Sequence, residues 1–444
     1  MLVPPHDVER REVERPEREY ELTSTEKFKS FVRELGPGLV TGAADDDPSG
    51  IATYSLAGAA FGYHLLWTAI VTLPLMTAVQ LMCARIGVVT RRGLAAVLRE
   101  HYSRWLLWFA CLLLLVANTI NIAADLGGMA AAASMLSGIP SVWFVPAFTI
   151  AILALLIFAS YAYMTRIFKW LTLVLFAYVL AAFVANPDWF EVFRETFLPR
   201  IQYTHDYLLT FVAILGTTIS PYLFFWQAAQ NAEQKEHLEK KIEGRPRRAM
   251  ERELRSSGRD VGAGMFISNL IMFFIILTAG ATLHKAAQTN IETAEQAAAA
   301  LRPLAGNAAY LLFTLGLVGT GMLAVPVLAG SAAYALAEAG AWNAGMSEKI
   351  HDARNFYGVI AIAMLIGMAM NFAHFNAVRL LFWTAVINGL LAPPLIIILL
   401  FVCNNPKVMG DHRNGWKLNL FGILAAALMT FAGAALVFSW FKYS

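Results

Sequence analysis

Long apolar segments recur along the whole chain, and they constrain its fold more than any other feature. Each is about 20 residues long, the length that an α-helix needs to cross a bilayer core of roughly 30 Å. The composition agrees, because 58% of the residues are hydrophobic, 15% are charged and the mean hydropathy is +0.56. We expect eleven spans, at residues 38–60, 64–89, 105–137, 141–164, 167–186, 206–230, 262–283, 306–337, 356–373, 379–403 and 418–441. The sequence therefore predicts an all-α, multi-pass membrane protein without a separate soluble domain.

The charged residues between these spans predict how the chain is oriented. Residues 1–36 are charged and lack an apolar core, so they predict a solvated tail and not a cleaved secretory signal. With this tail in the cytoplasm, most basic loop residues, including those of the run 236–259, fall on the cytoplasmic side. The positive-inside rule then places the N-terminus in the cytoplasm and the C-terminus outside the plasma membrane. The net charge of +3 follows from this topology and predicts no nucleic-acid partner.

Two of the predicted spans contain helix-breaking residues. The first carries DDDPSG at residues 45–50, and the sixth carries GTTISPY at residues 216–222. Proline removes a backbone donor and glycine loosens the helix, so both spans should unwind there. Broken helices in positions one and six are typical of two inverted five-helix repeats, with a substrate site where the breaks meet. We expect a first repeat at 37–186, a second at 206–403, and an eleventh helix within 404–444.

The aspartates of the first break predict a cation site. Unwound backbone within a bilayer is tolerated where it lines a cavity or contacts a ligand. A buried carboxylate without a counter-charge is costly, and no lysine, arginine or histidine lies at the same depth in the sequence. We therefore expect the transported ion to be the counter-charge of Asp47, with Asp45 and Asp46 as accessory acids. The alternative is that these aspartates face a water-filled vestibule and bind nothing.

At these residues the chain resembles a known family. GPGLVTGAADDDPSG, LAGAAFGYHLLW and ARIGVVT resemble the first two helices of the NRAMP divalent-metal transporters, and TTISPYLFFWQ resembles their sixth helix. The resemblance runs in order from about Leu35 to Leu400, and it implies the leucine-transporter (LeuT) fold and uptake of divalent metals. The divalent cation is then the transported substrate, and we expect no resident cofactor. We expect the lipid bilayer to surround the chain and no obligate protein partner.

The first metal-binding motif departs from that family in one residue that carries a ligand. The family has Asp-Pro-Gly-Asn, where this chain has DPSG at residues 47–50. The resemblance implies that Asp47 is the metal-binding carboxylate and that the backbone carbonyl of Ala44 is a ligand. The family's asparagine ligand becomes Gly50, which has no side chain.

The second motif departs as well. The family's Met-Pro-His reads Ser220-Pro221-Tyr222, so a hydroxyl replaces the thioether ligand, and the backbone-carbonyl ligand falls at Thr217. A thioether favours transition ions, whereas oxygen ligands suit magnesium and manganese. Loss of two ligating side chains also predicts a roomier pocket for a partly hydrated ion. The pattern is similar to the NRAMP-related magnesium transporters (NRMT), although Ser220 could instead only cap the unwound backbone.

The residues expected for proton coupling are largely missing. By the same resemblance, Asn121 and Ala124 stand where the family has an acidic pair, and Tyr222 and Gln227 stand where it has two histidines. Asp125 lies next to one of these positions and could replace the missing acid. We expect uncoupled entry of magnesium and manganese by alternating access.

Three alternative functions stay open at this stage. The first is a proton-coupled manganese or iron importer, and the second is a sodium-coupled solute symporter on the same fold. The third is a membrane aspartyl hydrolase that uses Asp47 and Asp125, although no HExxH or nucleophile-elbow motif supports an enzyme. Cys83, Cys111 and Cys403 lie in separate apolar segments and predict no disulfide framework.

Overall fold

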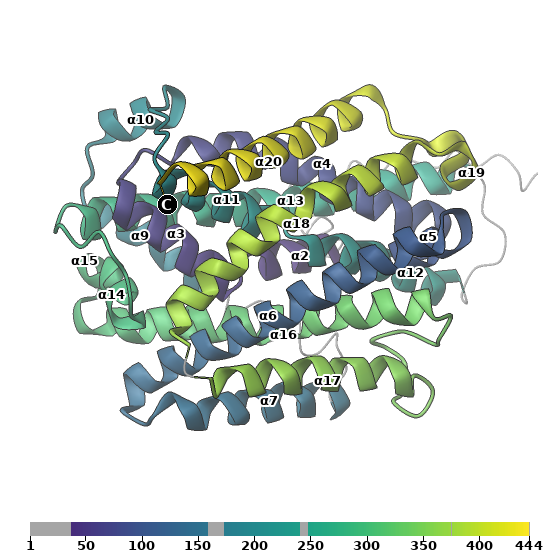
Figure 1. The fold of residues 1–444 in the computed structure, drawn as a ribbon, viewed down its shortest axis with the longest axis horizontal. Coiled ribbons are helices and arrows are strands. Elements are labelled where there is room, and N and C mark those ends of the chain that lie inside the picture. Colours follow the sequence, from purple (N-terminus) through teal and green to yellow (C-terminus); the bar gives the residue numbers. More distant parts are fainter. Residues whose placement is uncertain (1–36, 159–172, 240–246, 374, 444) are drawn as a thin grey trace, which may run out of the picture. The chain divides into compact units, whose positions relative to one another are not determined.

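The computed structural model describes residues 37–158, 173–239, 247–373 and 375–443 (Figure 1). The predicted tail at 1–36 and parts of the predicted spans 141–164 and 167–186 lie outside these residues. Within them all regular structure is helical, and no strand occurs.

Thirteen of the helices in the described residues make up the two broken spans and the body of the bundle. They are α2 (Pro37–Asp45), α3 (Pro48–Phe61), α4 (Trp67–Thr90), α6 (Arg104–Ser137), α7 (Ser141–Phe158), α9 (Phe176–Val184), α11 (His205–Thr218), α12 (Pro221–Glu239), α13 (Arg247–Ala279), α16 (Ala309–Ala339), α17 (Arg354–Asn371), α18 (Ala377–Asn404) and α20 (Trp416–Tyr443). Shorter helices connect them: α5 (Leu94–His101), α10 (Trp189–Phe197), α14 (Ala294–Ala298), α15 (Arg302–Ala305) and α19 (Pro406–Met409).

Nine helices among the described residues are long and apolar enough to cross a bilayer. The count rises to ten if the bent pair Leu173–Val184 and Trp189–Phe197 is one span, although these two segments meet at 117°. The first predicted span is not in this count, because it is divided between α2 and α3. The all-helical membrane fold is therefore confirmed, whereas the number of eleven spans and the division into two repeats stay predictions.

Glycines bring the helices around α2 into direct backbone contact. A Cβ atom added at Gly38 would stand 2.5 Å from the backbone nitrogen of Val261 on α13. At the other broken span, a Cβ atom on Gly216 of α11 would collide with the backbone of Ala385 and Gly389 on α18. Each broken helix thus packs against an unbroken neighbour with no side chain between them at these positions.

The short helices gather at the two ends of the bundle. Helices α5 and α19 lie at one end, and α10, α14 and α15 lie at the other, together with the C-terminus (Figure 1). The predicted orientation makes the end with α10, α14 and α15 extracytoplasmic.

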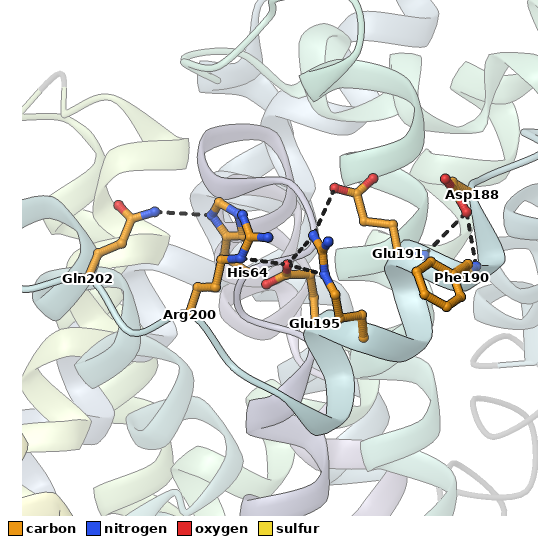
Figure 2. A network of polar contacts seen from close by, with 8 residues as sticks. His64, Asp188, Phe190, Glu191, Glu195, Arg200 and Gln202 are labelled. Carbon is orange, nitrogen blue, oxygen red and sulfur yellow. Dashed lines mark hydrogen bonds and ion pairs between the residues drawn. The ribbon is translucent and has the colours of Figure 1, made fainter.

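A polar network organises the segment that follows α9 at this end (Figure 2). The Glu195 side chain is fully buried, and its Oε1 contacts Arg194 at 2.8 Å and Arg200 at 3.2 Å. Gln202 lies 3.0 Å from Nδ1 of His64, which belongs to the turn between α3 and α4. These contacts tie residues 194–202 to the outer end of the first broken span.

Candidate ion-binding site at the helix breaks

The first span breaks at its aspartates. Helix α2 ends at Asp45, and α3 begins at Pro48 with Asp47 as its N-cap. Aspartate accepts hydrogen bonds from the first turn of a helix, and proline at the first helical position needs no N–H donor. The sequence DDDP therefore encodes a new helix start inside the membrane, as predicted.

The Asp47 carboxylate is buried, with an exposed fraction of 1%. Its Oδ1 accepts hydrogen bonds from the Ser49 hydroxyl at 2.6 Å and from the Gly50 backbone N–H at 2.8 Å. Its Oδ2 accepts one from Nδ2 of Asn121, on α6, at 3.1 Å. All three donors are neutral, so they orient the carboxylate without balancing its charge.

The second break lies between Thr218, the last residue of α11, and Pro221, the first of α12. The Ser220 hydroxyl donates to the carbonyl oxygens of Thr217, at 2.8 Å, and Gly216, at 3.0 Å. This is the capping role that the sequence left open as an alternative. The hydroxyl oxygen keeps its lone pairs, so capping and ion ligation by Ser220 are compatible.

One hydrogen bond joins the two breaks. The Tyr222 hydroxyl, on the first turn of α12, donates to the backbone carbonyl of Ala44 at 2.7 Å. The predicted carbonyl ligands of Ala44 and Thr217 thus belong to one region, at the C-terminal ends of α2 and α11. Such ends carry the negative pole of the helix dipole and attract cations.

The space beside Gly50 differs from the expectation. A Cβ atom at this position would stand 3.1 Å from Oγ1 of Thr217 and 3.3 Å from the Tyr54 ring. Neighbouring side chains have closed in where the family carries an asparagine, so the absence of a side chain at Gly50 does not by itself create the roomier pocket that the sequence predicted.

Asp45 and Asp46 contact α13. Both carboxylates accept from the Ser268 hydroxyl on α13, at 2.7 Å for Asp45 and 3.2 Å for Asp46. Both side chains are buried, and Oδ1 of Asp45 has no hydrogen-bond partner. Ser268 was missed from the sequence, because a lone serine in an apolar helix is a weak signal.

Asp125 lies on α6 and is fully buried. Neither carboxylate oxygen has a hydrogen-bond partner, although the Asp47 carboxylate and the Ser49 backbone N–H lie within electrostatic range. The structure thus places Asp125 near the first break, and its role as a replacement for the missing acid stays a prediction.

The charge balance of the region is negative. The buried charged side chains in the described part of the chain are all acidic, and none is a lysine, arginine or histidine. No group of three or more histidine, cysteine, aspartate or glutamate side chains in that part is arranged to hold a metal ion. An ion here would need hydroxyl, amide and carbonyl oxygens beside its carboxylates.

Gln227 belongs to a chain of four polar side chains, of which Thr41, Gln227 and Asn231 are buried. The Thr41 hydroxyl donates to Oε1 of Gln227 at 2.5 Å, and Gln227 donates to Asn231 at 3.3 Å. Asn231 in turn donates to the Ser257 hydroxyl at 3.2 Å. None of these four side chains titrates near neutral pH. This chain joins α2, α12 and α13 through hydrogen bonds but offers no site for an excess proton.

Helix α2 is also held at its start. Asp260 of α13 accepts from the backbone N–H groups of Gly38, at 2.7 Å, and Leu39, at 3.1 Å. A carboxylate at the positive end of a helix is a favourable placement. The half of the first span nearer the N-terminus is therefore anchored at both ends.

Comparisons with known proteins agree with this geometry. The natural resistance-associated macrophage protein-like (Nramp) family matches residues 38–439. The divalent metal cation transporter MntH of Erwinia tasmaniensis is 26% identical over 427 residues, which cover 93% of this chain and 95% of the relative. MntH of Deinococcus radiodurans is 30% identical over 296 residues, which cover 65% of each chain.

Solved structures show the same fold. The manganese transporter of Eremococcus coleocola superposes with a TM-score of 0.72 at 18% identity, over 95% of this chain and 88% of that one. The inward-facing conformation of Mhp1 gives a TM-score of 0.51 at 13% identity, over 91% and 90%. The family match spans both helix breaks and every helix from α3 to α18. The chain belongs to the Nramp family.

Proposed function

We propose that the chain carries divalent cations, above all magnesium and manganese, across the plasma membrane through the site at the two helix breaks. The membership of the Nramp family supports transport of divalent metals, and the MntH relatives are named as divalent metal cation transporters. These relatives are transporters, so the prediction that the chain is not an enzyme agrees with them and the hydrolase alternative is set aside.

The observation that carries the proposal is the unbalanced charge of Asp47. Its carboxylate is buried, is oriented only by neutral donors and lies near the carbonyl-rich ends of α2 and α11. A buried carboxylate without a counter-charge costs several kcal/mol. A cation that passes through the site supplies the positive charge that the surrounding protein lacks. We propose Ala44, Thr217 and Ser220 as further oxygen ligands, and Gly50 as the donor that orients Asp47.

The choice of magnesium and manganese follows from the donor atoms. The side chains and carbonyls gathered at the breaks offer carboxylate, hydroxyl, amide and carbonyl oxygens, and Ser220 occupies the place of a thioether. Oxygen-only sites suit magnesium and manganese and lose the preference for softer ions.

We also propose that transport is not coupled to protons. The polar chain through Gln227 consists of amides and hydroxyls, and the described histidines lie outside the buried interior. A relay needs titratable groups in series, and amides do not provide them.

A proton-coupled manganese importer is the second candidate. Two observations favour it: the relatives are MntH proteins, and Asp125 is a titratable group beside Asp47. The two candidates differ in whether the entry of an ion changes the internal pH.

Proteoliposomes that contain a pH-sensitive dye and receive magnesium, manganese or calcium separate these candidates. We expect magnesium and manganese to enter and compete with each other, with the internal pH unchanged. Acidification that accompanies manganese entry and disappears in Asp125→Asn would support the coupled importer. The absence of uptake for all three ions would overturn the proposed function.

A further inference from the structure

Three buried oxygen atoms on α6 have no hydrogen-bond partner. They are Oδ1 of Asn121 and both carboxylate oxygens of Asp125, and both side chains are fully buried. The two residues are four apart, so they lie on the same face of α6, one turn from each other. The amide nitrogen of Asn121 already donates to Asp47, which places this face against the first break.

Buried polar atoms without partners are rare, because each costs about 1–3 kcal/mol and a charged one costs more. The described part of the chain has no buried lysine, arginine or histidine to satisfy them. The nearest positive feature is the N-terminus of α3, where the Ser49 N–H faces Asp125. The group that would satisfy these oxygens is therefore a cation.

We propose that Asn121 and Asp125 line the ion-binding site from α6, on the face of that helix that lies against the first break. They supply two ligands in addition to those carried by α2, α3 and α11, and we call these two residues the second wall of the site. This inference rests on the proposed function and extends it. Asp47 and Asp125 would each bring one negative charge to the ion, and the buried Asp45 and Asp46 lie at the same break. In a region of low dielectric constant, this concentration of negative charge favours a divalent ion over sodium or potassium.

Two adjoining cavities lead from one end of the bundle towards helix α3, which starts at the first break. A cavity of about 560 Å³ opens at the end with α14 and is lined by residues of α6, α7, α14, α17 and α18, with Glu292 and Glu295 among them. It shares Ala131 and Val378 with a deeper cavity of about 10 Å³, roughly the room that one water molecule occupies. The deeper cavity reaches Ala52, on the second turn of α3.

Two residues that line the deeper cavity, Ala52 and Leu381, belong to a small apolar cluster. Ala52, Ala124 and Leu381 pack together as a separate small cluster, which we call the plug. Asp125 follows Ala124 directly in the sequence. In the proposed route, an ion passes from the wide cavity past the plug towards the carboxylates of Asp47 and Asp125.

The test uses the full chain in detergent, with manganese as the probe. Calorimetric titration gives the manganese affinity, and the melting temperature with and without manganese reports ion-linked stabilisation separately from folding. Asp125→Asn removes the charge and keeps the shape. Glu295→Gln is the matched control, because it removes one negative charge from the same route outside the plug.

We expect Asp125→Asn to weaken manganese binding by at least about tenfold and to shrink the manganese-induced rise in melting temperature. Its melting temperature without manganese should be no lower than that of the wild type, because the variant lacks the unpartnered buried charge, and Glu295→Gln should bind manganese like the wild type. The double variant Asn121→Asp with Asp125→Asn moves the charge by one turn and should recover part of the lost affinity. This recovery also tests the proposal if Asp125→Asn alone folds poorly.

One outcome would contradict the second wall alone, and another would contradict the proposed function. If Asp47→Ala abolishes manganese binding while Asp125→Asn binds within about threefold of the wild type, the second wall is wrong and the proposed function stands. If the wild type binds no manganese, calcium or magnesium, the proposed function itself fails.

Discussion

Exchange of Asp47 for asparagine removes the charge from the site and keeps the local helix start. Asparagine caps helices about as well as aspartate, and its side-chain oxygen can still accept from Ser49 and the Gly50 backbone. The fold should therefore persist. Any change in ion binding then reports the loss of charge and not the loss of α3.

The size of the effect follows from the burial of this carboxylate. Asp47 is 1% exposed, so its interaction with a bound cation is hardly screened by solvent. Removing one partner of a buried charge pair costs about 3–5 kcal/mol, and about 1.4 kcal/mol corresponds to tenfold, so the affinity should fall by roughly 100- to 3,000-fold.

Calorimetric titration with manganese and uptake of radiolabelled manganese into proteoliposomes measure this loss. Asp188→Asn is the matched control, because Asp188 is the N-cap of the exposed helix α10 and accepts from Phe190 and Glu191 at 3.0 and 3.2 Å. The control should bind and transport like the wild type. If Asp47→Asn retains an affinity within about threefold of the wild type, the ion is not the counter-charge of this carboxylate and the reasoning is refuted.

Three further predictions address selectivity, access and the anchoring of α2. Ser220→Met restores a soft ligand, so in competitive uptake the preference should shift towards manganese or cadmium and away from magnesium; an unchanged ratio would show that Ser220 only caps the backbone. Access can be measured in a variant without native cysteines, with a membrane-impermeant maleimide added outside. Ser134→Cys, in the lining of the wide cavity, should react quickly, and Ala124→Cys, in the plug, should react slowly. Equal rates would contradict the plug. Asp260→Ala removes the acceptor of two backbone N–H groups of α2, so hydrogen–deuterium exchange over residues 38–45 should accelerate by roughly 10- to 100-fold, and unchanged exchange would show that the anchor is dispensable.

Much of the fold was predictable because membrane helices have a strong sequence signal. Apolar segments of span length gave the helices, and the pairs Asp47-Pro48 and Ser220-Pro221 gave the helix starts within the first and sixth spans. Both signals are local in the sequence. The bend of 117° between Leu173–Val184 and Trp189–Phe197, by contrast, depends on how the segment folds back at the end of the bundle.

The site was predictable only in part, because its contacts join residues far apart in the sequence. Asp47 could be singled out as an unpaired charge, but its bond to Asn121 crosses 74 positions, and the bond from Tyr222 to Ala44 crosses 178. The space beside Gly50 could not be judged from the sequence, because Thr217, which lies close to it, belongs to another helix. The spacing of Asn121 and Asp125 by one helical turn was a signal that could have been used.

Anomalous diffraction from crystals grown with manganese tests the central claim most directly. The account predicts one manganese peak between the two helix breaks, about 2.0–2.6 Å from a carboxylate oxygen of Asp47 and surrounded only by oxygen ligands. A structure in which manganese binds elsewhere, while the Asp47 carboxylate keeps only its bonds to Ser49, Gly50 and Asn121, would contradict it.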